Sequence, residues 1–96
     1  MAKIKPEKKI KRKKIQFEFH SPDANEVNIV GDFNQWEPKK HIMKKGKNGA
    51  WEKTAMLPPG TYEYKFLVDG SWVEDPENPE RCLNRFGTLN NVLKVS

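Results

Sequence analysis

Two tryptophans of this 96-residue chain, Trp36 and Trp72, are set in polar turns rather than in apolar runs. Trp36 ends the segment Gly-Asp-Phe-Asn-Gln-Trp, and Trp72 follows Val-Asp-Gly-Ser. An indole offers a flat, rigid, apolar surface and a single N–H donor, which suits stacking on the apolar face of a ligand. The alternative is that each indole folds back as a lid on the core, since large apolar side chains are usually at least partly covered.

Several loops supply neutral hydrogen-bonding side chains: Asn34, Thr88, Asn90 and Asn91. Amides and hydroxyls together provide the donors and acceptors that a neutral polyhydroxyl ligand needs, and the C–H faces of a sugar match an aromatic surface. Tryptophans, amides and one lysine therefore favour carbohydrate over nucleic acid, which favours Arg and Lys arrayed around aromatic residues. The alternative is that these side chains cap turns by bonding nearby backbone, which explains Asn34 well and also fits Asn91.

The residues suited to catalysis or metal binding lack the required arrangement. Carboxylates cluster in one polar segment: Glu74, Asp75, Glu77 and Glu80. Glycoside hydrolysis needs two carboxylates at a defined separation, with burial or a close charge to raise one pKa, and a solvated loop gives neither. His20 and His41 are predicted to lie at the surface, and with Cys82 they show no metal-ligand spacing. We therefore predict no enzyme activity, no metal and no cofactor.

The net charge of +5 is unevenly distributed along the chain. Residues 1–14 contain eight Lys or Arg residues and one Glu, whereas residues 15–96 contain ten basic and twelve acidic residues. We predict a basic, flexible N-terminal arm at 1–14 and one folded domain at 15–96, which needs no polyanionic partner. Nucleic acid is not an expected partner of the domain. For the arm, salt-dependent binding to an anionic surface competes with a role as a solubilising tail.

The cysteine content and the apolar segments of the sequence indicate the compartment. One cysteine, Cys82, cannot form an internal disulfide, which favours a reducing compartment. The basic N-terminus is not followed by the apolar stretch of a secretory signal, and no apolar run approaches the length of a membrane span. We expect the chain in the cytoplasm and away from membranes.

Alternation of apolar and polar residues predicts short β-strands. The clearest are 15–20, 27–30, 51–56 and 62–68, with shorter ones at 41–44, 72–73 and 92–95. Asn48-Gly49 and Asp69-Gly70 predict hairpin turns, because these residues tolerate positive φ. The long polar segment 75–90 is predicted to be a loop.

Short strands with frequent turn signals and no helical periodicity predict an all-β fold, an immunoglobulin-like antiparallel β-sandwich. A small OB-type barrel is the structural alternative. Within the fifth strand, Lys65 has the opposite parity to Tyr64 and Phe66 and is expected to face away from the core. Trp51 lies inside a strand, so we expect it to serve stability or a surface that does not bind glucan.

Four ordered motifs make the chain similar to a known family. They are VGDFNQW (30–36), LPPGTYEYKF (57–66), VDGSW (68–72) with an Asp-Pro pair after it, and GTLNNV (87–92). In this order and spacing they resemble family 48 carbohydrate-binding modules, which include the glycogen-binding domain of AMP-activated protein kinase β subunits and the early-set domains of isoamylases and glycogen branching enzymes. The resemblance covers roughly residues 15–95.

The resemblance implies an early-set β-sandwich that binds α-1,4-glucan such as glycogen, starch or maltodextrin. In glucan-binding members, tryptophans at the positions of Trp36 and Trp72 stack on successive glucose units. A lysine at the position of Lys65 donates to hydroxyls. The first asparagine of the Asn-Asn pair, Asn90 here, also bonds hydroxyls, and Thr88 lies beside it.

Phe86 departs from the family pattern. A bulky apolar residue before Gly87 reaches into the curve of the glucan, and other members carry leucine there. Phe86 keeps the apolar contact and is expected to alter which chain length or branch fits. The implied partners are an α-glucan oligo- or polysaccharide and a glucan-active enzyme or kinase subunit. The competing hypothesis is a structural early-set domain that mediates protein contacts without binding sugar.

Overall fold

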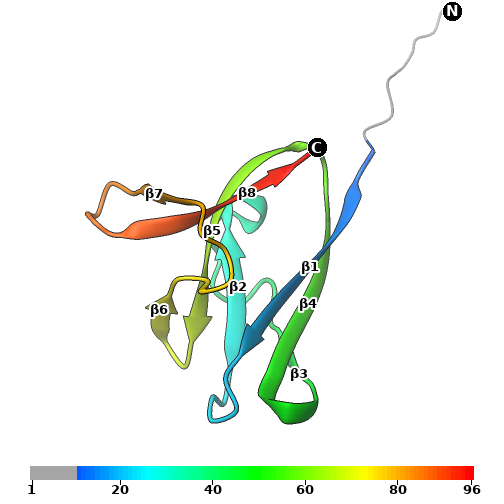
Figure 1. Ribbon diagram of the computed structural model, residues 1–96, viewed down its shortest axis with the longest axis vertical. Helices are drawn as coiled ribbons and strands as arrows, with labels where there is room; N and C mark the ends of the chain where they lie inside the picture. The colour runs from blue at the N-terminus through cyan, green and yellow to red at the C-terminus, as the bar shows by residue number, and fades with distance from the viewer. Residues whose placement is uncertain (1–10) are drawn as a thin grey trace, which may run out of the picture.

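Residues 11–96 are described by a computed structural model, and nearly all their regular structure is β-strand (Figure 1). In chain order the strands are β1 (Lys13–His20), β2 (Val27–Gly31), β3 (Lys44–Lys45), β4 (Ala50–Leu57), β5 (Gly60–Val68), β6 (Ser71–Val73), β7 (Arg81–Leu83) and β8 (Leu89–Val95). Two short 3-10 turns, η1 (Asp32–Asn34) and η2 (Lys47–Gly49), follow β2 and β3. In this part of the chain no helix is long and apolar enough to span a membrane.

The strands form two antiparallel sheets that pack against each other. One sheet has the order β1-β4-β3, and the other has the order β2-β5-β8-β7 with β6 also paired to β5. Figure 1 shows β1 and β4 side by side on one side of the molecule, with β7 and the start of β8 on the other. This arrangement confirms the predicted all-β, immunoglobulin-like antiparallel sandwich rather than the OB-type barrel.

β5 is the central strand of the larger sheet. β2 pairs along one of its edges, from Tyr64 to Val68. On the opposite edge, β8 pairs with Gly60–Tyr64 and β6 pairs with Phe66–Val68. β6 and β8 therefore diverge at Lys65, the residue between the two pairings. This divergence leaves Lys65 without a strand partner on that edge of β5.

The core lies between the sheets and is rich in aromatic side chains. Phe17 of β1 and Tyr64 and Phe66 of β5 are at most 4% exposed. The Phe17 and Tyr64 ring centroids lie 5.4 Å apart in an edge-on arrangement, which favours the positive edge of one ring against the negative face of the other. Trp51 is also buried, and its indole N–H donates to the carbonyl oxygen of Ser21 at 2.8 Å. The period-two pattern predicted the inward positions of Phe17, Tyr64 and Phe66.

The two predicted hairpin turns are confirmed. Asn48 and Gly49 have φ values of +59° and +75° between β3 and β4. Asp69 and Gly70 have φ values of +48° and +85° between β5 and β6. Both pairs use the left-handed region, which asparagine, aspartate and glycine enter at low cost.

The predicted strand at residues 41–44 is divided between the two sheets. Backbone hydrogen bonds of 3.1 Å and 2.8 Å join His41 and Met43 to β2, so this part extends the larger sheet. The next two residues form β3 and pair with β4 of the smaller sheet. Alternation of apolar residues cannot specify which sheet so short a segment joins.

Two further boundaries differ from the prediction. β7 lies within the segment 75–90 that was predicted as loop, and it forms because it pairs with the first residues of β8. Three residues are too few to show alternation. β1 begins at Lys13, inside the segment assigned to the N-terminal arm. Residues 1–10, which make up most of that arm, lie outside the described residues.

Candidate functional site

A groove of about 1340 Å³ opens on the outer face of the larger sheet, between β6 and the loop that joins β7 to β8. It is lined by every residue predicted to bind glucan: Trp36, Lys65, Trp72, Phe86, Thr88 and Asn90. The rest of the lining consists of Gln35, Glu63, Val73, Glu74, Leu83, Asn84 and Arg85. The fold thus brings together side chains from the turn after β2, from β5, from β6 and from the end of the chain.

Trp36 is held in its turn by both its backbone and its indole. Its φ is +57°, and its backbone N–H donates to the carbonyl oxygen of Gly31 at 2.9 Å. The indole N–H donates to Asp32 Oδ1 at 2.9 Å, while Asp32 Oδ2 accepts the backbone N–H of Glu63 at 2.7 Å. One carboxylate, which the sequence analysis did not single out, ties the indole to β5. Because its indole N–H is already bonded to Asp32, Trp36 can offer a ligand its ring face.

Trp72 lies on β6, opposite Leu67 of β5, and is 49% exposed. Its ring contacts that of Trp36, with the centroids 6.2 Å apart and the planes inclined by 61°. Within the described residues, neither tryptophan belongs to the buried core cluster. The two indoles are therefore not core lids, and they form one angled aromatic surface in the groove.

Asn34 and Gly31 build the turn that carries Trp36. Asn34 is 1% exposed, and its Oδ1 accepts the backbone N–H of Gly31 while its Nδ2 donates to the carbonyl oxygen of Ile29, both at 3.0 Å. Asn34 thus caps the turn as predicted. A Cβ at Gly31 would lie 2.5 Å from the carbonyl oxygen of Glu63, so glycine is required where the turn approaches β5.

His41 supports the same turn, which corrects its predicted surface position. Its Nδ1 lies 3.0 Å from Asn34 Nδ2, and its ring packs edge-on against Phe33 with the centroids 5.7 Å apart. Because an amide nitrogen can only donate, His41 Nδ1 is the acceptor and is deprotonated in this contact. Burial, with repulsion from Lys53 and Lys40, lowers the pKa of His41 below its usual value.

Lys65 lies in the floor of the groove, where β6 and β8 diverge. It points away from the core that Tyr64 and Phe66 enter, as its parity predicted, and it is 8% exposed. Its Nζ donates to Thr88 Oγ1 at 3.2 Å. A poorly exposed ammonium needs hydrogen-bond acceptors to offset its lost hydration. The contact also links the central strand to the loop before β8.

Asn90 lies on the same outer face and is 6% exposed. Its Nδ2 donates to Glu63 Oε1 at 2.9 Å, and across the sheet it is paired with Cys82 of β7. Burial and the neighbouring Glu63 raise the pKa of Cys82, so this thiol stays protonated and weakly nucleophilic. The chemistry that this part of the groove can perform is hydrogen bonding.

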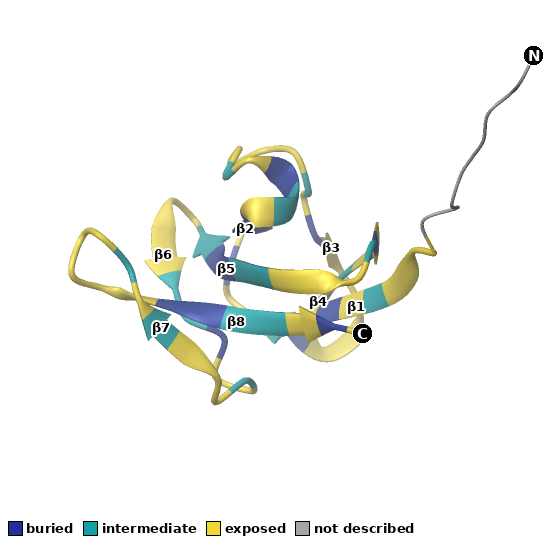
Figure 2. Ribbon diagram, turned by 90° about the horizontal axis from the view of Figure 1, so that it is seen from above, coloured by how far each residue is buried: buried dark blue, intermediate teal, exposed yellow. Residues whose placement is uncertain are grey.

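The loop between β7 and β8 forms the second wall of the groove. Phe86 and Leu83 are 81% and 72% exposed, and the Arg85 guanidinium lies 5.6 Å from the Phe86 ring centroid. Figure 2 shows this loop as an exposed segment that extends away from the buried centre. Asn84 holds it, because its Oδ1 accepts the backbone N–H groups of Phe86 and Thr88. Asn84 was not predicted from the sequence, although asparagine is typical of such turns.

Asp75 corrects the prediction that the carboxylates of residues 74–80 are solvated. It is 7% exposed, and its Oδ2 accepts the hydroxyl of Tyr64 at 2.7 Å. Its backbone N–H donates to Asn91 Oδ1 at 2.6 Å, so this group braces the start of β8 from the core side. Burial, and to a lesser degree Asp75, raise the pKa of Tyr64.

Within residues 11–96 no cluster of His, Cys, Asp and Glu is suited to a metal.

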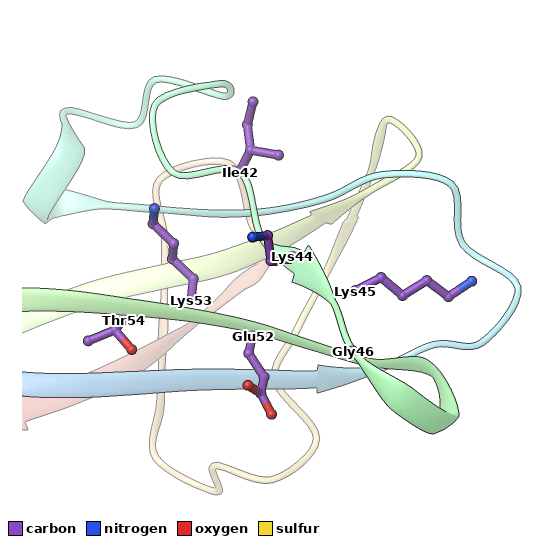
Figure 3. A pocket seen from close by; sticks show the side chains of 7 residues that line it. All are labelled: Ile42, Lys44, Lys45, Gly46, Glu52, Lys53 and Thr54. Atoms are coloured by element: carbon purple, nitrogen blue, oxygen red, sulfur yellow. The ribbon is translucent and has the colours of Figure 1, made fainter.

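A smaller hollow of about 400 Å³ lies beside β3 and β4 (Figure 3). Its lining consists of Ile42, Lys44, Lys45, Gly46, Glu52, Lys53 and Thr54. In Figure 3 the charged ends of Lys45, Lys53 and Glu52 point in different directions. Lys45 Nζ already donates to the carbonyl oxygen of Pro22 at 2.8 Å. Because its polar groups do not converge and its lining has no aromatic ring, this hollow lacks the features of the groove.

Comparisons with known proteins show the family to which this chain is similar. Residues 13–96 match the family model described as the glycogen recognition site of AMP-activated protein kinase. The chain is 39% identical over 75 residues to the β-2 subunit of 5'-AMP-activated protein kinase from Homo sapiens, an alignment that covers 78% of this chain and 26% of that protein. It is 41% identical over 73 residues to Protein PTST homolog 2, chloroplastic, from Arabidopsis thaliana, covering 76% of this chain and 13% of that protein.

The fold also recurs in a larger protein of known structure. The crystal structure of maltogenic amylase from S. marinus superposes with a TM-score of 0.76 at 24% identity, covering 88% of this chain and 14% of that one. At this identity the likeness establishes the fold alone. The family match spans nearly all the described residues and includes every residue of the groove. The chain therefore belongs to the family defined by the glycogen recognition site of AMP-activated protein kinase.

Proposed function

We propose that this chain is a non-catalytic module that binds α-1,4-linked glucan in the groove around Trp36 and Trp72. The observation that carries the proposal is the angle of 61° between the two indole planes, at a centroid distance of 6.2 Å. Successive rings of an α-1,4-linked glucan are inclined to one another because the chain is helical, so each ring can stack on one plane. A flat β-1,4-linked chain cannot follow both planes.

Three polar residues complete the proposed recognition. The Lys65 ammonium carries three N–H donors, of which one bonds Thr88. Thr88 Oγ1 accepts from Lys65 and from Asn84, and the described contacts leave its own hydroxyl proton available to a ligand. Asn90 uses one amide N–H toward Glu63 and one lone pair toward Asn84, which leaves it one donor and one acceptor. This mixture matches sugar hydroxyls, which both donate and accept.

Modest affinity is expected from so open a site. Stacking on an indole contributes about 1 kcal/mol beyond the area it buries. Two such stacks and a few partly exposed hydrogen bonds correspond to dissociation constants in the micromolar to millimolar range. Because sugars are uncharged, the affinity is expected to change little with salt concentration.

Tryptophan fluorescence tests the proposal directly. Titration with β-cyclodextrin and with maltoheptaose is expected to give saturable changes in emission, and cellohexaose at the same concentrations is expected to give none. The competing hypothesis, a structural early-set domain, predicts no response to any sugar and no retention on immobilised glycogen. Equal responses to maltoheptaose and cellohexaose would contradict the argument from the inclined planes.

The whole-protein role is a further part of this proposal, because the chain spans about a quarter or less of the length of the two relatives described above. We propose that the module brings a glucan-active enzyme or a kinase subunit to its polysaccharide in the cytoplasm. The name of the Arabidopsis relative places that protein in the chloroplast. Fractionation of cells, followed by identification of proteins that co-elute with the tagged chain from glycogen, tests both the compartment and the partner.

A further inference from the structure

Asn84 is the hydrogen-bonding centre of the loop between β7 and β8. Its Oδ1 accepts the backbone N–H of Phe86 at 2.9 Å and that of Thr88 at 3.1 Å. Its Nδ2 donates to Thr88 Oγ1 at 2.7 Å and to Asn90 Oδ1 at 2.9 Å. Its backbone closes the same loop, since its N–H donates to the carbonyl oxygen of Thr88 at 2.8 Å.

These contacts use the full capacity of the side chain. A carboxamide has two N–H donors and two acceptor lone pairs, and all four are engaged within the loop. Asn84 lines the groove but has no remaining group with which to bond a ligand. In contrast, Thr88 and Asn90 each retain a group that can face the ligand. Any effect of Asn84 on binding must therefore act through its neighbours.

We infer that Asn84 is a positioning residue, which fixes Phe86, Thr88 and Asn90 in their binding arrangement before the ligand arrives. This inference rests on the proposed function. Without the side chain of Asn84, the backbone N–H groups of Phe86 and Thr88 would bond only water, and Phe86 would lie on a less ordered, exposed loop. Ordering that loop during binding would then reduce the affinity, since each immobilised side chain has an entropic cost.

The first test uses no ligand. Amide hydrogen exchange followed by NMR is expected to show the N–H groups of Phe86 and Thr88 protected in the wild-type chain and unprotected in Asn84→Ala. Asn84→Asp keeps the acceptor oxygen and is expected to restore the protection of Phe86. Equal exchange rates in the wild-type chain and Asn84→Ala would overturn the inference, whether or not the chain binds glucan.

The second test is a double-mutant cycle with β-cyclodextrin as the ligand. Asn84→Ala is expected to weaken binding about tenfold. If Asn84 acts through the loop, the same change made in a Phe86→Ala background is expected to cost clearly less than in the wild-type background. Fully additive effects would overturn the inference, because they would indicate a general loss of structure.

Asn78→Ala is the matched control for loss of stability. The Nδ2 of Asn78 donates to Tyr64 Oη at 3.1 Å and to the carbonyl oxygen of Val92 at 2.9 Å, on the core side of the sheet. This variant is expected to unfold at a lower temperature with unchanged affinity. An equal loss of affinity in Asn78→Ala would overturn the specific role of Asn84. A wild-type chain that shows protected loop amides but binds no sugar would refute the proposed function and leave the loop-ordering result standing.

Discussion

Asp32 and Trp36 form a side-chain hydrogen bond within a single turn, with the indole nitrogen 2.9 Å from Oδ1. The second carboxylate oxygen accepts the backbone N–H of Glu63 at 2.7 Å. These two hydrogen bonds fix the ring plane of Trp36 relative to β5, the central strand of the larger sheet. Its inclination to Trp72, which we propose selects a curved glucan, thus depends on a residue outside the lining of the groove.

Replacing Asp32 by alanine releases the indole of Trp36 and removes the acceptor for Glu63. We expect the affinity for β-cyclodextrin to fall about fivefold, the effect of losing roughly one hydrogen bond. Fluorescence titration measures it. Asp23→Ala, which changes an exposed aspartate in the β1–β2 connection, serves as the control. An unchanged affinity in Asp32→Ala would show that the orientation of Trp36 does not depend on this carboxylate.

Replacing either groove tryptophan by alanine removes one stacking surface. Trp36→Ala and Trp72→Ala are each expected to weaken glucan binding by at least about tenfold. Both variants are expected to keep a cooperative thermal transition, because neither indole is in the core cluster of the described residues. Calorimetry of binding and of unfolding measures the two effects separately.

Trp51→Ala is the contrasting variant. Trp51 is 6% exposed, and its indole N–H bonds the carbonyl oxygen of Ser21, so its loss creates a cavity and removes one hydrogen bond. The free energy of unfolding is expected to fall by about 3–5 kcal/mol. If Trp51→Ala were as stable as the wild-type chain while Trp36→Ala unfolded, the assignment of core and groove would be reversed.

Gly31→Ala tests the close approach of the Trp36 turn to β5. The added Cβ would lie 2.5 Å from the Glu63 carbonyl oxygen and 2.7 Å from the Tyr64 Cβ, so backbone must move. Chemical denaturation is expected to show a loss of about 1–3 kcal/mol. At Gly46 the nearest atom is 3.2 Å away, and Gly46→Ala is expected to cost less. Equal losses at both positions would contradict the steric argument.

The lowered pKa of His41 makes stability depend on pH. The unfolded chain, with the ordinary histidine pKa of 6.5, binds more protons than the folded chain below that pH. The free energy of unfolding should therefore decrease as the pH falls below 6.5 toward the lower folded-state pKa. His41→Gln keeps an acceptor for Asn34 without titrating. Urea denaturation across this range is expected to show a smaller pH dependence in the variant, and an equal dependence would contradict it.

The strands that could be predicted from the sequence are those with a sustained pattern. β1 and β5 alternate over residues 15–20 and 62–68, and both were located within two residues of their ends. β7 and the division of residues 41–45 between two sheets were missed because each segment is short and is defined by the strand with which it pairs. Local periodicity contains no information about such pairing.

The residues of the groove could also be predicted from the sequence only where local properties identify them. Trp36 and Trp72 were singled out by residue type and turn position, which are local properties. The family resemblance added Lys65, and its strand parity agrees with an outward position. Asp32 was missed because its role includes a hydrogen bond to the distant backbone of Glu63. Asn84 was missed because its hydrogen bonds depend on how its own loop folds. Asp75 was predicted as solvated because polarity of a segment does not reveal that one of its side chains turns inward toward Tyr64.

A ¹H–¹⁵N NMR titration of the wild-type chain with maltoheptaose shows directly whether the groove binds glucan. We expect saturable shifts of the Trp36 and Trp72 indole N–H signals and of the Thr88 and Asn90 backbone amides, with the amides beside β3 unchanged. Shifts confined to the hollow between β3 and β4, or no shifts at millimolar sugar, would contradict this expectation.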